Sequence, residues 1–584
     1  MYPDFPASGL PADIHASMTS RLLLVPTLLL LAGACAAPPK AQQRAPEWDA
    51  FVQEFLDSSY AADPAFAVTL GRHEYDGRLA DFSDAGIRHQ IARLHAARDK
   101  ALGFDSARLD SAQRFDREYL VSVIDGQLFW TERAEWPWKN PQYYATPLDP
   151  QAYVTRDYAP LDQRLKAITG WARAVPAAVR QIRRNLRTPM PPTFADIGRI
   201  QFGGLEDFLA KDIPAVFASV SDPALQADFK AARLAALKSL KEMDTWFAAE
   251  RKRAKGSFAM GPALFAEMLH ATERVDVPLD QLERIARQDL QRNLGALRAA
   301  CSTYAPRKTL KQCVDQENRH KPQGDLVVAA AAQLPMLEKF IREHDVAGIP
   351  DSEPVLVRES PPYMRWNFAF LNSRGLFEKN VASIYYVSPP DPAWPPKERA
   401  EYLPGIAPLL FTSAHEVWPG HFLHFLHINH VASPVGRIYQ TYAYTEGWAH
   451  YAEEMMYDAG LGDDVPQTHI GQLTEALLRN VRFVSAIGLH TRDMTVAESE
   501  RMFLDKGFQD AGNARQQAAR GTFDPAYLNY TLGKLMIRKL RDDWTATRGG
   551  KAAWKQFHDA FLSFGGPPIP LVRKAMLGSS SGAL

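Results

Sequence analysis

Apolar residues recur at helical spacing through most of residues 49–345, and this pattern constrains the fold more than any other feature of the sequence. Segments such as LDQRLKAITGWARAVPAAVRQIRRNL and LDQLERIARQDLQRNLGALRAAC place apolar side chains at positions i, i+3, i+4 and i+7. Short stretches with proline and glycine separate these segments, and no fixed-period repeat relates them, which disfavours a solenoid. The sequence therefore predicts a mainly α-helical protein.

The pattern changes near residue 350, where short runs of β-branched and aromatic residues stand between prolines. We expect a small sheet within 353–390, followed by further helices. A chain of 584 residues exceeds one ordinary core, so we expect two lobes. The predicted divisions are a helical N-terminal lobe at 49–350, a second lobe at 351–577 and a disordered tail at 578–584.

The first 35 residues are typical of a bacterial export signal. Their apolar core spans about 10–13 residues, which is too short to cross a bilayer. Met18 starts such a signal better than the first residue does. The segment AGAC, ending at Cys35, is similar to a lipobox, in which the cysteine is lipidated; the alternative is cleavage after Ala34 and free release. We expect an exported, periplasmic protein, anchored to the membrane as a lipoprotein through Cys35, with residues 36–48 as a flexible tether.

Charge and composition limit the classes of partner that the protein can bind. Lys+Arg and Asp+Glu both number 67, so no net field attracts nucleic acid or an anionic membrane. Hydrophobic residues make up 46% and charged residues 23%, as in soluble globular enzymes rather than disordered chains. We therefore expect no nucleic-acid partner and membrane contact only through the lipid anchor. The sequence leaves the oligomeric state open.

Two cysteines remain after the signal segment, Cys301 and Cys313. An exported chain tolerates disulfides, and these two residues close a short loop. We expect a structural disulfide between them; two buried free thiols are the alternative.

The stretch HEVWPGH at residues 415–421 begins like a zinc-protease motif but departs from its spacing. Zinc helices of that type place the second histidine four residues after the first. Here His421 follows His415 by six residues, and on a regular helix six steps rotate about 600° and rise about 9 Å. Pro419 cannot donate its N–H and clashes with the carbonyl of His415, and Gly420 adds backbone freedom. We predict a bulge or kink between Val417 and Gly420 that brings the two imidazoles together.

A second stretch, TEGWAHYAEE at residues 445–454, supplies the acidic partner. Two histidines and one glutamate form a standard catalytic zinc shell, which leaves one coordination position for water. His415, His421 and Glu446 are therefore the predicted metal ligands. Glu416, next to His415, has the position of a general base that takes the proton of the attacking water.

A row of histidines continues beyond this motif: His421, His424, His427 and His430 recur every three residues. Each step of three turns a helix by about 300°, so the row drifts around the surface. The row is either a strip that binds metal or a set of polar positions in an amphipathic helix. A strip that binds metal would suit a non-catalytic metal-binding lipoprotein, although a storage site has no use for a base at Glu416.

The two motifs together resemble the bacterial domain-of-unknown-function family numbered 885, whose pattern is His-Glu-x-x-Pro-Gly-His-x-x-Gln followed by Thr-Glu-Gly-Trp-Ala. LGRHEYDGRLADFS at 70–83 and YLNYTLGKLMIRKLRDD at 527–543 are similar to further segments of that family. The family is grouped with zinc metallopeptidases of the gluzincin type. The resemblance implies a two-lobed helical metallopeptidase-like fold around a deep cleft, with a small β-sheet beside the active-site helix and one zinc ion.

Carried over position by position, the resemblance implies the same roles for His415, His421 and Glu446 as ligands and for Glu416 as catalytic base. It adds Tyr530, which matches the tyrosine of the family's C-terminal Tyr-x-x-Gly-Lys helix. Such a tyrosine can donate a hydrogen bond to the tetrahedral oxyanion.

The sequence departs from the family pattern at two positions. His424 stands where glutamine is expected, and we predict a second-shell or substrate role for it. His450 stands where a hydrophobic residue is common, four residues after Glu446, and either orients a ligand or serves polar packing.

Other residues are candidates for contacting the substrate. We predict that VASIYYV at 381–387, which includes Tyr385, forms a strand flanking the cleft, to whose edge an extended substrate could add its backbone. Arg365, Lys534 and Arg538 are candidates for holding a substrate carboxylate, although surface or structural ion pairs are the commoner use of such residues.

The sequence thus favours a zinc-dependent metallopeptidase of the cell envelope that hydrolyses peptides. One alternative is a zinc hydrolase of a non-peptide amide or ester, and another is the non-catalytic metal-binding lipoprotein. Zn²⁺ is the expected cofactor, although Mn²⁺ and Co²⁺ accept the same ligands.

Overall fold

The computed structural model describes residues 44–361, 365, 368–390 and 394–584, and in these residues helices predominate. This confirms the prediction of a mainly helical protein with a small sheet. The predicted signal segment, with Cys35, and most of the predicted tether lie outside the described residues. Within the described segments, no helix combines the length and apolar character that crossing a bilayer requires.

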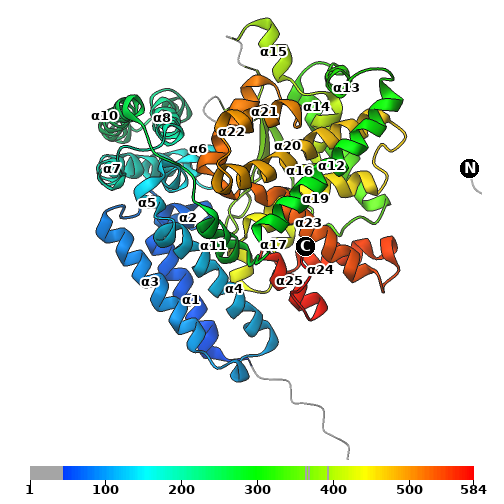
Figure 1. Cartoon of the computed structure of the whole chain (residues 1–584). Coiled ribbons are helices and arrows are strands. Elements are labelled where there is room, and N and C mark those ends of the chain that lie inside the picture. The colour runs from blue at the N-terminus through cyan, green and yellow to red at the C-terminus, as the bar shows by residue number, and fades with distance from the viewer. Residues whose placement is uncertain (1–43, 362–364, 366–367, 391–393) are drawn as a thin grey trace, which may run out of the picture. The chain divides into compact units, whose positions relative to one another are not determined.

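The first helices pack around a core of their own. Figure 1 shows α1 (Pro46–Ala62), α3 (Asp84–Gly103) and α4 (Ser111–Leu128) side by side, and all three contribute to one apolar cluster. A second cluster joins α7 (Leu161–Asn185), α8 (Pro192–Asp207) and α10 (Pro223–Arg253), which lie together at the upper left of Figure 1. Burial of the apolar stripe along α7 explains why its spacing predicted a helix.

The largest core runs across residue 350. It contains residues of α11 (Pro262–Glu273), α12 (Leu279–Tyr304) and α14 (Leu326–Glu343) together with α20 (Pro466–Thr491) and later helices. The predicted lobe boundary near 350 therefore does not separate two hydrophobic cores. Gln43–Leu584 form one compact unit, and the two-lobed division stays a prediction.

The sheet has three strands, β1 (Val355–Glu359), β2 (Ala369–Asn372) and β3 (Ser383–Val387), in the order β1-β3-β2. Strand β3 pairs parallel with β1 and antiparallel with β2, with Leu371 opposite Tyr385. VASIYYV therefore contains a strand, as predicted, but the idea that a substrate adds to its edge is wrong. Its backbone groups already pair on both sides, so the outer edges of this three-stranded sheet belong to β1 and β2.

Shorter helices connect these parts. They are α2 (Pro64–Thr69), α5 (Trp136–Lys139), α6 (Gln151–Thr155), α9 (Ile213–Val216), α13 (Leu310–Glu317), α15 (Pro396–Tyr402), α18 (Pro434–Ile438), α21 (Val496–Asp505), α22 (Ala511–Phe523), α24 (Trp554–Leu562) and α25 (Ile569–Leu577). Cys301 at the end of α12 and Cys313 in α13 form a disulfide, with their Cα atoms 5.9 Å apart. Near the C-terminus, Arg573 donates to the carbonyl of Ser581 over 2.8 Å and Leu584 packs against the main core, while the disorder expected of residues 578–584 stays a prediction.

The segment at residues 70–83 connects the first helices to the chain between β2 and β3 through His73. His73 bonds through Nδ1 to Asp76 and through Nε2 to Glu378, each over 3.0 Å. Its ring stacks on Tyr158 with centroids 3.5 Å apart. Burial lowers the pKa of His73, but the hydrogen bonds to the two carboxylates outweigh burial and raise the pKa to about 9.

Candidate metal centre

The helix is interrupted between His415 and His421, the two histidines of the HEVWPGH motif. Helix α16 (Ile406–Glu416) ends one residue after His415, and α17 (His421–Ile428) begins at His421 itself. The expected bulge or kink within one helix is therefore wrong in form, because residues 417–420 leave helical geometry altogether. Gly420 donates its N–H to Ala414 over 2.9 Å, and a Cβ at Gly420 would lie 1.7 Å from the carbonyl oxygen of His415. Only glycine fits there, and the turn brings the two imidazole centroids to 4.8 Å.

Helix α19 (Tyr442–Asp458) supplies the third group, Glu446. Its Oε2 lies 3.4 Å from Nε2 of His415 and 3.4 Å from Nε2 of His421. A charge-assisted hydrogen bond is shorter, at about 2.7–2.9 Å. Ligands about 2.0–2.1 Å from a tetrahedral zinc ion stand about 3.3–3.4 Å apart. Glu446 is therefore spaced from each histidine as ligands of one ion are, rather than as groups bonded directly to each other.

Two further observations fit a divalent cation. Oε2 of Glu446 is buried and has no hydrogen-bond partner, which leaves a buried acceptor to be satisfied. Burial raises the pKa of Glu446, but His421 and His415 outweigh it and hold the pKa well below its ordinary value. Among the described residues, these three form the one group with ligand atoms close enough to share a metal, all within 4.8 Å.

A buried carboxylate orients the first histidine. His415 donates through Nδ1 to Glu453 over 2.7 Å, and Glu453 also lies 3.3 Å from Arg479 and 3.4 Å from His450. This hydrogen bond directs Nε2 of His415 toward the cluster, as carboxylates do for zinc-bound histidines. Sequence reasoning missed Glu453, although it follows Glu446 by seven residues and so lies on the same face of α19.

Glu416 is held by the sheet. The backbone N–H of Leu371 in β2 donates to its Oε2 over 2.9 Å. Burial raises the pKa of Glu416, while His415 and His421 oppose the shift. Beside it, the buried hydroxyl of Tyr385 lies 3.3 Å from the Ser413 hydroxyl. Tyr385 therefore supports α16 from β3 through its contact with Ser413.

Two glycines bring Tyr530 to the cluster. Helix α23 (Asn529–Thr545) crosses α19 so closely that a Cβ on Gly447 would lie 2.6 Å from the Cα of Gly533. The Tyr530 ring is thereby stacked on the ring of His415, with centroids 6.3 Å apart. The glycines of TEGWA and YTLGK thus position an acid and a tyrosine from distant segments at one site.

Three arginines surround the same tyrosine. The guanidinium carbons of Arg479, Arg482 and Arg520 lie 6.0, 4.7 and 5.9 Å from the centroid of the Tyr530 ring. None of the three was predicted from the sequence, because buried arginines carry no local signal beyond ordinary helix positions.

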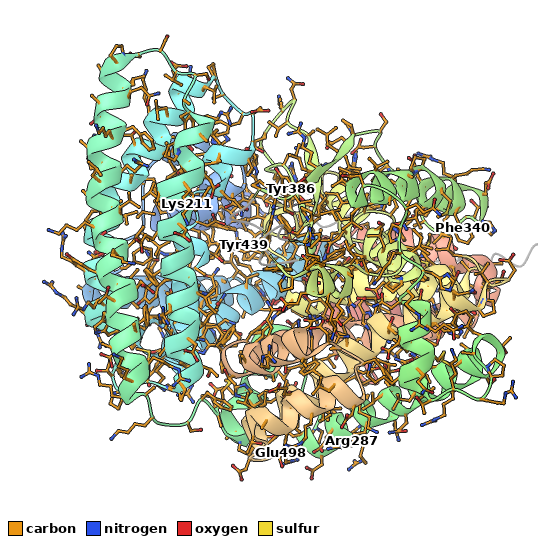
Figure 2. The ribbon with its side chains drawn as sticks, turned by 90° about the horizontal axis from the view of Figure 1, so that it is seen from above. Lys211, Arg287, Phe340, Tyr386, Tyr439 and Glu498 are labelled. Carbon is orange, nitrogen blue, oxygen red and sulfur yellow. A yellow bond between two sulfur atoms is a disulfide. The ribbon has the colours of Figure 1, made fainter. Side chains whose placement is uncertain are left out.

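A cavity of about 1580 Å³ reaches the cluster. Glu446, Tyr530, Arg482 and Arg520 form part of its wall, and residues of α1, α3 and α8 form another part. Tyr439, another wall residue, is labelled near the middle of the view in Figure 2. The volume of the cavity exceeds the roughly 300–1,000 Å³ of ordinary small-molecule pockets.

The other histidines of the row, His424, His427 and His430, form hydrogen bonds within the fold. His424 is buried and donates to the carbonyl of Gly565 over 2.5 Å, and burial lowers its pKa to about 3. His427 bonds to the Gly348 carbonyl and His430 to Asp351. The row does not converge on a second metal site within the described residues, and the predicted substrate role of His424 is not supported. His450, by contrast, reaches the cluster indirectly through Glu453.

The predicted carboxylate anchors are already paired. Lys534 is buried between Asp289 and Glu454, at 3.2 and 2.9 Å. Arg538 bonds to Glu454 over 2.8 Å, and Arg365 pairs with Glu359. Ion pairs within the fold use these charges, which is the commoner use of such residues, and among the described residues none of the three lines the cavity; an anchor role at these residues is not supported.

Fold and site together define a mainly helical protein with a partly buried cluster of two histidines and one glutamate that suits a divalent metal. The chain belongs to the family described as "Bacterial protein of unknown function (DUF885)", whose model matches residues 64–576. No curated protein matches the chain.

Two solved structures share the fold. One, described as "a putative lipoprotein of unknown function from Shewanella oneidensis", has a TM-score of 0.74 and 23% identity, and the match covers 91% of this chain and 99% of that one. The other, from Colwellia psychrerythraea, is called "the putative lipoprotein"; it has a TM-score of 0.78 and 15% identity, over 91% of this chain and 98% of that one.

Proposed function

We propose that the protein is a zinc-dependent peptidase that hydrolyses peptides with metal-activated water. The observation that carries the proposal is the cluster itself. Glu446 stands 3.4 Å from each of two histidine nitrogens, with its buried oxygen otherwise unpartnered, and a carboxylate orients one of the histidines. Membership of the gluzincin-type peptidases, implied by the resemblance, is part of the same proposal.

The residues divide the chemistry between them. A zinc ion at such a site supplies a Lewis acid that polarises a carbonyl and acidifies water. Glu416, fixed by the N–H of Leu371, takes the proton of the attacking water and delivers it to the leaving amine. The hydroxyl of Tyr530 donates to the oxygen on which negative charge develops.

The cavity favours a peptide over a small amide or ester as the substrate. About 1580 Å³ of space leading to Glu446 and Tyr530 admits several residues of an extended chain. A hydrolase of a small non-peptide amide would need far less room. A storage protein would need neither Glu416 nor the oriented His415.

We also propose that the protein is an exported lipoprotein of the periplasm. The signal-like segment ending at Cys35 supports this, as do the two solved structures described as lipoproteins. Globomycin, which blocks lipoprotein signal cleavage, together with Cys35→Ala, tests the anchor by membrane fractionation.

Metal analysis of purified variants tests the centre. His415→Ala, His421→Ala and Glu446→Ala should each lose one bound divalent metal, because each removes one of three ligands. His427→Ala is the matched control and should keep it, since that imidazole bonds to the carbonyl of Gly348. Full metal content in His421→Ala would reject the cluster.

Glu416→Gln then tests catalysis separately from binding. Glutamine keeps the size of glutamate and can still meet the β2 backbone, but it cannot hold the transferred proton. We expect full metal content and a fall in kcat of about 10²–10⁴-fold on a peptide. Near-normal turnover with full metal would reject the proposed mechanism.

A further inference from the structure

One of the three arginines around Tyr530 has no acidic partner in the part of the chain that the structure describes. Arg482 in α20 is buried, with 7% of its surface exposed. Its Nε donates to Gln517 over 2.8 Å, and its guanidinium carbon lies 4.7 Å from the Tyr530 ring centroid. Among the described residues, no carboxylate forms an ion pair with it. Its neighbours differ in this respect, because Arg479 pairs with Glu453 and Glu475, and Arg520 with Asp524.

A buried guanidinium without a counter-ion is costly. Arginine stays charged at neutral pH and carries five N–H donors, of which the bond to Gln517 uses one. Removing such a charge from water costs several kcal/mol unless an opposite charge compensates. Arg520 stands close by and adds a second positive charge, so the surroundings do not offset the first. Burial, and then Arg520, lower the pKa of Arg482.

The cavity gives this charge access to a ligand. Arg482 lies in the cavity wall together with Glu446 and Tyr530. Its two terminal nitrogens form no hydrogen bond with the described residues and are not fully buried, so they keep some contact with the cavity space. A planar guanidinium with free donors matches a carboxylate, which it binds through two parallel hydrogen bonds.

We propose that Arg482 binds the C-terminal carboxylate of the peptide substrate, so that the protein is a carboxypeptidase. This rests on the proposed peptidase function and names the substrate class of the same site. The Tyr530 ring lies near both Arg482 and His415, with its centroid 4.7 Å from the guanidinium carbon of Arg482 and 6.3 Å from the imidazole centroid of His415. Because both residues lie close to one ring and an extended chain covers about 3.3–3.6 Å per residue, the proposal places the cleaved bond one or two residues before the carboxylate.

The proposed reaction is an ordinary hydrolysis of a peptide bond near the C-terminus of the substrate. The C–N bond before the last one or two residues breaks, the hydroxyl of water joins the acyl carbon, and its proton passes to the amine nitrogen. The products are a shortened peptide with a new carboxylate and a free amino acid or dipeptide. Arg482 is a binding residue in this scheme, whereas Glu416 moves the proton.

Matched peptides test the proposal on the zinc-loaded full chain. One peptide has a free C-terminus, a second is the same peptide amidated, and a third is amidated and ends in glutamate. The third distinguishes a terminal carboxylate from a side-chain carboxylate. We expect kcat/KM to favour the free peptide over both amides by about 10- to 100-fold, the usual worth of hydrogen bonds to a charged group.

Arginine variants then locate the preference. Arg482→Ala should abolish the preference for the free peptide, and Arg482→Lys, which keeps a charge, should restore part of it. Arg538→Ala is the matched control, since that arginine already pairs with Glu454, and should leave the preference unchanged. Metal content and melting temperature of each variant show that it is folded. Equal cleavage of free and amidated peptides by the wild type, or equal losses on both in Arg482→Ala, would overturn the proposal.

Binding separates this proposal from the proposed function. In Glu416→Gln, calorimetry should show tighter binding of the free peptide than of the amide, and the further change Arg482→Ala should remove the difference. A wild type that cleaves no peptide but shows this binding pattern would reject the peptidase and keep the carboxylate site. Equal binding of the free peptide and both amides would reject the site whatever the turnover. Preference for the amide ending in glutamate would overturn the C-terminal assignment.

Discussion

Gly533 is the position at which we expect a single methyl group to damage the metal centre without touching a ligand. A Cβ there would lie 1.9 Å from the carbonyl oxygen of Ala443 and 2.8 Å from the Cα of Gly447. Both obstacles are backbone atoms of α19, the helix that carries Glu446. Gly533→Ala therefore has to push α19 and α23 apart, because no side chain can rotate out of the way.

The structure sets the size of the effect. An ordinary contact between carbon and a carbonyl oxygen is about 3.3 Å, so the helices must separate by roughly 1.4 Å. Overpacking of this kind costs about 1–3 kcal/mol in the free energy of unfolding. The same shift exceeds by far the roughly 0.2 Å tolerance of metal–ligand distances. We therefore expect at least a tenfold loss of zinc affinity as well.

Urea denaturation and zinc titration against a competing chelator measure the two effects. Gly295→Ala is the matched control, because Gly295 lies within α12 and a Cβ there meets nothing within 4 Å. Alanine should stabilise that helix by about 0.5–1 kcal/mol, since glycine costs conformational entropy. If Gly533→Ala matched the wild type in stability and zinc affinity, the close helix crossing would not be what positions Glu446.

Two further predictions concern charges near the site and far from it. Glu453→Gln should weaken zinc affinity by about 10- to 100-fold while His427→Ala does not, because only Glu453 orients a ligand; unchanged affinity in a competition titration would contradict this. His73→Phe should lower the melting temperature at pH 6 and much less above pH 9. Because the pKa of His73 is raised to about 9 in the folded state, His73 stabilises the fold fully below its unfolded-state pKa of about 6.5, and this stabilisation is lost as the pH rises through about 9. A difference in melting temperature between variant and wild type that does not change with pH would refute the assignment.

Much of the fold and the centre of the site could be predicted from local patterns. Apolar spacing indicated the long helices, and β-branched runs between prolines located the sheet. His415, His421 and Glu446 could be proposed as ligands because their motifs are short and because Pro419 and Gly420 predict a bend there, although the bend was expected as a kink in one helix and not as a break between two. These features depend on a few neighbouring residues, so the sequence contains them directly.

What tertiary structure alone decided is the partner of each buried charge. The sequence treated Lys534 and Arg538 as equal candidates for a substrate carboxylate, yet both pair with Glu454 inside the fold. Arg482, an ordinary helix position in the sequence, lies in the cavity wall without a carboxylate. Likewise β3 became the central strand only through pairing on both sides. Local sequence sets which element forms and which face is apolar, whereas the crossing of distant helices and strands decides which charges are neutralised and which face the cavity.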